Sequence, residues 1–174
     1  MRKDNFLEVI SILASELNLE TVAVKRILDC YLNVCREDLL NGSIVRFGKL
    51  VTLVPDPILS EYVKTKAWYC KMISVQTCYS YYTVLGVVTA FLDKIESDLQ
   101  QGVAVDLRTL CTFHPLLTES DEVRIRTSIS GTIREELQRR VSGVISVRVH
   151  TSKLIKHSVK TCGLMPSEEG GVLV

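Results

Sequence analysis

Apolar side chains recur at helical spacing along the first forty residues of the chain. One face repeats every three or four residues and comprises Phe6, Val9, Ile10, Leu13 and Leu17. A second face follows the same rule and comprises Val24, Ile27, Leu28, Tyr31, Cys35 and Leu39. Such faces are typical of helices that pack on a core. Asn18 is predicted to cap the N-terminus of the second helix, and Gly42 to stop that helix.

Alternating apolar positions follow Gly42 and predict a small β-structure. Residues 44–54 read as two short strands, with a tight connection near Gly48 and Lys49. Pro55, Asp56 and Pro57 then end the unit.

The same order of patterns returns sixty residues later, which indicates an internal duplication. Gly102 repeats Gly42, and Pro115 repeats Pro55. Helices are therefore predicted at about 67–74 and 80–99, and strands at 103–107 and 110–114. Further on we expect a strand at 122–129, a helix at 132–141 that begins with a capping box, a strand at 144–149, a short basic helix at 152–160 and an extended or mobile end.

This order of elements resembles the bacterial histone-like HU and integration host factor family. Residues 42–53 are similar to the strand pair of that family, G-x-x-V-x-L-x-x-F-G-x-F, and residues 102–113 repeat the similarity. Residues 147–156 resemble its closing strand and the G-K-x-L-K start of its last helix. The similarity is closest to HU-like proteins of Bacteroides-type bacteria and their phages.

The resemblance implies an α+β fold of tandem HU/IHF-like units, each with two helices before a small antiparallel sheet. The first copy is a truncated unit at 1–57, and the second copy is a fuller unit at 64–161 with a β-arm and a short C-terminal helix. Residues 162–174 form a C-terminal tail. Because the family works as an intertwined dimer, the two copies are expected to form an internal pseudo-dimer of the helical base.

The chain departs from the family where DNA is bound. The family's arm carries R-N-P-x-T-G at its tip, and its proline wedges between base pairs. Residues 114–146 contain no Arg-Asn-Pro and no proline after Pro115, and the first copy has no arm. Val51 and Cys111 occupy the position of the family's second strand glycine.

Composition argues against a domain devoted to phosphate binding. The chain has 174 residues, of which 47% are hydrophobic, and its 21 basic and 20 acidic side chains leave a net charge of +1. It contains no apolar run of membrane-spanning length, and its N-terminus does not read as a signal peptide.

Positive charge gathers in the last third of the chain. The candidate contacts to nucleic acid or a partner are Arg124, Arg126, Arg134, Arg139, Arg140, Arg148, Lys153, Lys156 and Lys160. Arg124 and Arg126 alternate on one strand face, which suits a phosphate backbone. The other interpretation is that these cations form solvated faces and ion pairs between subunits with acids such as Glu135 and Glu136.

Candidate chemistry is sparse. The histidines, His114, His150 and His157, are scattered, and no nucleophile–base arrangement stands out. The six cysteines form no zinc-type pairs and are expected to be buried free thiols in a reducing compartment, with a disulfide framework as the alternative; they are Cys30, Cys35, Cys70, Cys78, Cys111 and Cys162. We therefore expect no catalytic residue, metal, cofactor or small-molecule substrate.

Two functions remain open. In the first, the protein is a non-enzymatic structural protein that forms homo-oligomers and packs against other structural proteins. The resemblance implies a setting in the phage virion, as a ring or connector component of the neck or tail. In the alternative, it is an architectural protein of the bacterial cytoplasm or nucleoid that binds duplex DNA non-specifically through residues 121–160. Neither interpretation involves a membrane.

Overall fold

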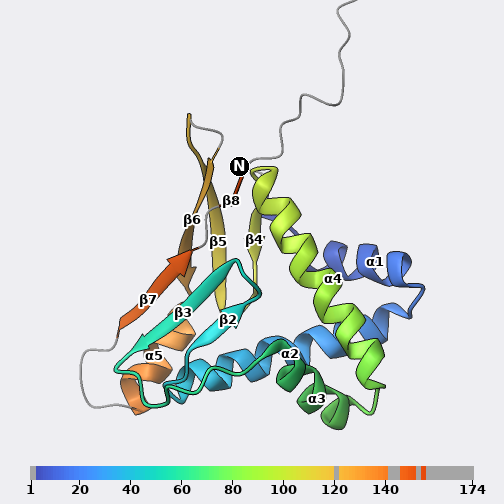
Figure 1. Cartoon of the computed structure of the whole chain (residues 1–174), viewed down its shortest axis with the longest axis horizontal. Helices are drawn as coiled ribbons and strands as arrows, with labels where there is room; N and C mark the ends of the chain where they lie inside the picture. The colour runs from blue at the N-terminus through green and yellow to red at the C-terminus, as the bar shows by residue number, and fades with distance from the viewer. Residues whose placement is uncertain (1–2, 120–121, 141–145, 152–153, 156–174) are drawn as a thin grey trace, which may run out of the picture.

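The computed structural model describes residues 3–119, 122–140, 146–151 and 154–155 as an α+β protein (Figure 1). The first copy contains four main elements: α1 (Phe6–Leu17), α2 (Thr21–Leu40), β2 (Val45–Phe47) and β3 (Val51–Asp56). The second copy repeats them as α3 (Lys66–Thr77), α4 (Tyr81–Gln100), β4 (Ala104–Asp106) and β5 (Cys111–Leu117). The remaining elements are β1 (Lys3–Asp4), β6 (Glu122–Ile129), α5 (Gly131–Arg140), β7 (Ser146–Thr151) and β8 (Leu154–Ile155).

The helices of the two copies are related by the sixty-residue shift at both ends. α2 and α4 stop in the same way, because Gly42 and Gly102 adopt left-handed conformations with φ of 78° and 81°. In both cases the residue after the glycine donates its N–H to a buried aspartate's carbonyl, from Ser43 to Asp38 and from Val103 to Asp98. The helices predicted for both copies are therefore confirmed.

The predicted role of Asn18 is wrong. Asn18 ends α1 in the left-handed conformation (φ 52°, ψ 48°), and its N–H bonds to the carbonyls of Ala14 and Ser15. α2 begins after Glu20, whose side chain makes no capping hydrogen bond. Asparagine suits both ends of a helix, since it tolerates a left-handed backbone and also caps N-termini.

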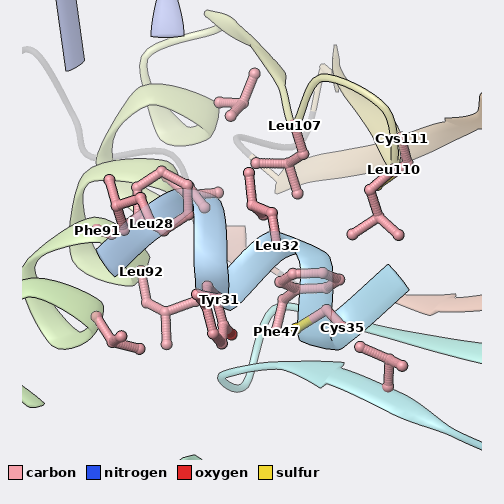
Figure 2. Close-up of a cluster of buried hydrophobic side chains, with 14 of the residues drawn as sticks. Leu28, Tyr31, Leu32, Cys35, Phe47, Phe91, Leu92, Leu107, Leu110 and Cys111 are labelled. Atoms are coloured by element: carbon pink, nitrogen blue, oxygen red, sulfur yellow. The ribbon is translucent and has the colours of Figure 1, made fainter. Parts of the chain in front are cut away.

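Aromatic side chains of both copies meet in one core. The rings of Tyr31 and Phe91, which occupy equivalent positions in the duplication, lie 6.4 Å apart edge to face. Phe47 of the first copy meets Phe113 of the second at 5.8 Å. Figure 2 shows side chains from both copies gathered around α2. Contact between equivalent positions is expected at the axis of a two-fold related pair.

The sheets divide the strands unequally between the two copies. One sheet has the order β1-β4-β5-β6-β8, and the other has the order β2-β3-β7. β7 pairs antiparallel with β3 along six positions, from Val51–Thr151 to Asp56–Ser146. The end of the chain therefore closes the sheet of the first copy. Because β8 then pairs with β6, the same segment links the two sheets.

The segments that precede α1 and α3 cross to the opposite copy. β1 lies parallel to β4, with Lys3 opposite Ala104. In the same way, the N–H groups of Leu59 and Ser60 donate to the carbonyl of Gly42, and Ser60 bridges to Ser43. Each copy thus covers a sheet edge of the other, which protects strands whose unpaired N–H and C=O groups invite aggregation.

The predicted basic helix at 152–160 is wrong at its start. Leu154 and Ile155 form a strand opposite Val123 and Glu122. The residues from 156 onward, and with them the C-terminal tail 162–174, lie outside the described residues. Within the described part of the chain, no helix combines the length and the apolar character that crossing a bilayer requires.

Candidate interaction surface on the two sheets

The strand β6 presents arginine on one face and apolar side chains on the other. Val123 and Ile125 are buried, whereas Arg124 and Arg126 are exposed, as the alternation predicted. Across the β5–β6 ladder, Arg126 lies opposite His114 and Arg124 lies opposite Leu116. We call the exposed side of both sheets the outer face; its cations on β6 are these two arginines.

The sheet of the first copy adds two more arginines to the outer face. Arg46 of β2 lies opposite Thr52, which lies opposite His150 of β7. Arg148 lies opposite Val54 and makes a 3.5 Å ion pair with Asp56. Both partners of that pair are half exposed to solvent, so it contributes at most about 1 kcal/mol.

Arg46 is a residue that the search of the sequence did not single out. It is the exposed residue between the buried Val45 and Phe47. A charged residue at the polar position of an alternating strand is the sequence signal that could have identified it. Among the described residues, no acidic side chain pairs with Arg46, Arg124 or Arg126.

The arginines of α5 behave differently, because they bind acids of their own chain. Arg140 donates to Glu136 at 3.1 Å and to Asn41 at 3.1 Å, and it lies 3.4 Å from Glu37. The hydrogen bond to Glu136 raises the pKa of Arg140. Arg139 lies 3.6 Å from the same Glu136. These contacts fix α5 to the end of α2. Arg139 and Arg140 are thus ion-pair partners, but within the chain and not between subunits as expected.

The structure describes one of the four remaining candidate cations. Arg134 is exposed on α5. The three predicted lysines, Lys153, Lys156 and Lys160, lie outside the described residues.

The end of β5 exposes two leucines beside the hairpin turn, and the turn begins with the polar Thr118 and Glu119. Leu116 and Leu117 are 49% and 55% exposed. Thr118 closes the turn by donating both its N–H and its hydroxyl to the carbonyl of Glu122. The two strands of the hairpin pair at seven positions, from Cys111–Ile129 to Leu117–Val123.

A hollow of about 490 Å³ lies where the hairpin meets the other sheet. Its walls include Leu116, Glu122, Arg124 and Arg126 of the hairpin and Thr151 of β7. The outer face is therefore indented at the junction of the two sheets, and the wall of the indentation combines leucine and two arginines with one glutamate.

Three of the described cysteines, Cys35, Cys70 and Cys111, are buried as expected, whereas Cys30 is half-buried and Cys78 is exposed. Burial raises the pKa of the Cys35 and Cys111 thiols, which keeps both sulfurs protonated at neutral pH. The five described cysteines are free. In the described ranges, no three His, Cys, Asp or Glu side chains are grouped so as to hold a metal ion.

A comparison with models of known protein families finds no match to this chain, and a comparison with curated proteins finds no similar sequence. The functional argument therefore rests on the geometry described above.

Proposed function

We propose that this protein is a non-enzymatic assembly protein with tandem HU/IHF-like units, which binds neighbouring protein subunits through the outer face of its sheets. The observation that carries the proposal is the exposure of Leu116, which lies opposite Arg124 on the outer face near the end of β5. Leu116 and Leu117 are exposed where the resembling family has a cationic DNA arm. Leucine gains nothing from a phosphate backbone, whereas burial against protein removes its surface from water.

The composition of the surface around Leu116 supports a protein partner. Arg124 and Arg126 line the same hollow as Leu116. Arginine beside apolar side chains is characteristic of protein–protein interfaces, where lysine and acidic residues are depleted. Such a surface binds by burying its centre while the cations pair with acids on the partner.

The arrangement of the copies supports tandem units that act as one body. The contact of Tyr31 with Phe91 joins equivalent positions inside a single chain. In a dimer, a contact of this kind would join two molecules. Here it lies inside one molecule, so a second molecule has to bind at another surface. A ring or connector of a phage neck or tail is the setting in which we place such a subunit.

Light scattering on the full chain tests the proposal. We expect a mass that is a multiple of the monomer, and we expect Leu116→Glu to reduce it because a charge on the outer face opposes burial. Leu59→Glu is the matched control, since Leu59 is also exposed but its backbone bonds to Gly42 at the end of α2 and not to the hairpin. A wild-type chain that stays monomeric, and is missing from purified phage particles, contradicts the proposal.

Duplex DNA is a second candidate, and one observation favours it. The outer face carries Arg46, Arg124, Arg126 and Arg148 on strands of both sheets. Together they form a cationic surface of the kind that contacts phosphates without reading sequence.

A low-salt titration with a duplex of about 30 base pairs separates this candidate from the first. If DNA is bound, Arg126→Ala lowers the affinity and reduces the salt slope by about one phosphate contact. Arg140→Ala is the control, since Arg140 already binds Glu136. A duplex that does not bind at low salt rejects the DNA candidate.

A further inference from the structure

A small cationic cavity lies away from the hairpin, between the β2–β3 turn and the start of α3. Its volume is about 160 Å³, roughly ten times what one water molecule needs. The cations in its wall are Arg46, Lys64 and Lys66. No carboxylate of the described residues is part of the wall. We call this space the first-copy cleft.

The cations of the cleft differ in how well they are paired. Lys64 binds the buried carboxylate of Asp38, and its ammonium lies 4.0 Å from the centre of the Trp68 ring. Lys66 donates to the hydroxyl of Thr89 at 3.1 Å. A hydroxyl is a neutral acceptor, and bonds between an ammonium and a carboxylate are roughly twice as strong.

The internal duplication supplies a comparison for this site. At the equivalent junction between the copies, Arg108 of the second copy stands at the position equivalent to Gly48, and Asp29 of the first copy stands at the position equivalent to Thr89. Arg108 makes a 3.1 Å ion pair with Asp29 and lies 4.8 Å from the centre of the Phe6 ring. Phe6, also of the first copy, is the equivalent of Lys66. That junction thus holds a cation, its carboxylate and an aromatic ring where the first-copy cleft is open.

We propose that the first-copy cleft binds a carboxylate presented by a partner protein, from an acidic side chain or a chain end. This inference rests on the proposed assembly function and names the partner's chemistry. The incoming carboxylate gives Lys66 the partner that Arg108 already has in Asp29. Arg46, at the mouth of the cleft, adds a second donor to the same group.

The neighbouring wall of α4 selects against a polyanion. A second hollow of about 350 Å³ shares Gly48, Lys66 and Leu92 with the cleft, and Asp93 and Glu96 line it. These acids repel a continuous phosphate backbone, since like charges in close approach are destabilising. A single carboxylate followed by neutral or basic residues fits both hollows.

Titrations of the full chain followed by NMR test the inference. Three probes are added separately: an acetylated peptide of alternating Glu and Lys, inorganic phosphate, and duplex DNA. We expect the peptide to shift the amide resonances of Gly48, Lys66 and Thr89. Thr89→Asp supplies the carboxylate within the chain and should weaken peptide binding about tenfold, as expected for the loss of one charge-assisted contact.

Thr89→Asn is the control, because it changes size in the same way without adding a charge, and it should bind like the wild type. The inference is overturned if no probe shifts these resonances, if only phosphate or duplex does, or if Thr89→Asp binds as well as Thr89→Asn. Light scattering on the same samples separates the two proposals. A monomeric chain that still binds the peptide overturns the assembly function and leaves the cleft in place.

Discussion

The two sheets of the molecule are closed in different ways. In the second copy, β5 ends at Leu117 and β6 begins at Glu122, so the two strands form a hairpin. In the first copy, β3 ends at Asp56, and its partner β7 begins only at Ser146. The first sheet therefore needs a strand from the last third of the chain. Pairing β3 with β7 closes the long segment between them, and the conformational entropy lost in that closure opposes folding of the whole molecule.

This difference shows that the first copy is incomplete without the second. The strand that completes its sheet follows every helix of the described residues, and segments β1 and 58–60 also cross between copies. We therefore expect the duplicated elements to unfold as one cooperative body rather than as two modules. We expect the following changes to reveal how far the two copies depend on each other.

The largest effect is expected at the aromatic contact between the copies. Phe91 is 1% exposed, and its ring meets those of Phe6 and Tyr31, both of the first copy. Phe91→Ala should lower the free energy of unfolding by about 3–5 kcal/mol, because it leaves a cavity in a shared core. Urea unfolding followed by fluorescence and circular dichroism measures the loss.

The two probes should report one transition for this variant, since both copies lose the same support. Tyr82→Ala is the control, because Tyr82 is 82% exposed, and it should change stability by less than about 0.5 kcal/mol. Two separate transitions in the wild type would contradict a single cooperative body.

A smaller effect is expected at two buried aspartates that occupy equivalent positions. Asp38 accepts a 2.7 Å hydrogen bond from the hydroxyl of Tyr69, which belongs to the other copy. Asp98 instead binds Lys94, one turn earlier on its own helix. The hydrogen bond from Tyr69 to Asp38 therefore ties the two copies together.

Tyr69→Phe removes that tie and should cost about 1.5–3 kcal/mol, the usual range for a hydrogen bond to a charged group. Denaturant titration measures the change. The exposed Tyr62 provides the control, and Tyr62→Phe should leave stability unchanged. If both variants unfold like the wild type, the bond between the copies contributes nothing.

The sequence predicted local elements well and long-range pairing poorly. The helices follow directly from the spacing of apolar residues such as Val24 and Leu28, which depends only on neighbours along the chain. The same alternation revealed the buried and exposed faces of β6. Nothing in the pattern of Val147 and Val149 indicated that their strand would join β3, because alternation shows which side is buried but not which strand lies beside it.

The candidate site was also predicted in part. Arg124 and Arg126 were correctly placed on one exposed strand face. Arg139 and Arg140 were grouped with them on charge alone, and the structure separates them because Glu136 and Glu37 lie within reach. The first-copy cleft could not be found from one copy; it depends on how Gly48 and Thr89 differ from their equivalents across the duplication.

Alkaline pH should weaken the core of both copies. Burial raises the pKa of the Cys35 thiol, and nearby Asp38 adds to the shift; burial likewise raises the pKa of Cys111. In the unfolded chain a thiol loses its proton near pH 8.5. The native state then holds more protons than the unfolded state, so stability is constant below that pH and falls above it, by about 1.4 kcal/mol per pH unit for each thiol.

Urea midpoints measured between pH 7 and pH 10 should therefore drop steadily above about pH 8.5. Cys35→Ala should lower the stability at pH 7 but reduce the steepness of the alkaline fall, since one titrating group is gone. A variant with the wild-type slope would show that Cys35 is not protected from ionisation in the native state.

The smallest effect separates the two sheets most directly. Val149 is half buried on β7, opposite Leu53 of β3, and packs against the core. Val149→Ser should cost about 1 kcal/mol through lost apolar burial. Because β7 pairs with the first-copy sheet alone, hydrogen exchange should speed up at Thr52 and Leu53 more than at Phe113 of β5. His150→Ser, one residue along on the outer face, serves as the control, and it should leave both sheets protected.

Equal loss of protection in β3 and β5 would mean that β7 supports both copies to the same extent. The two sheets would then differ in how their strands are connected along the chain but not in how stable they are.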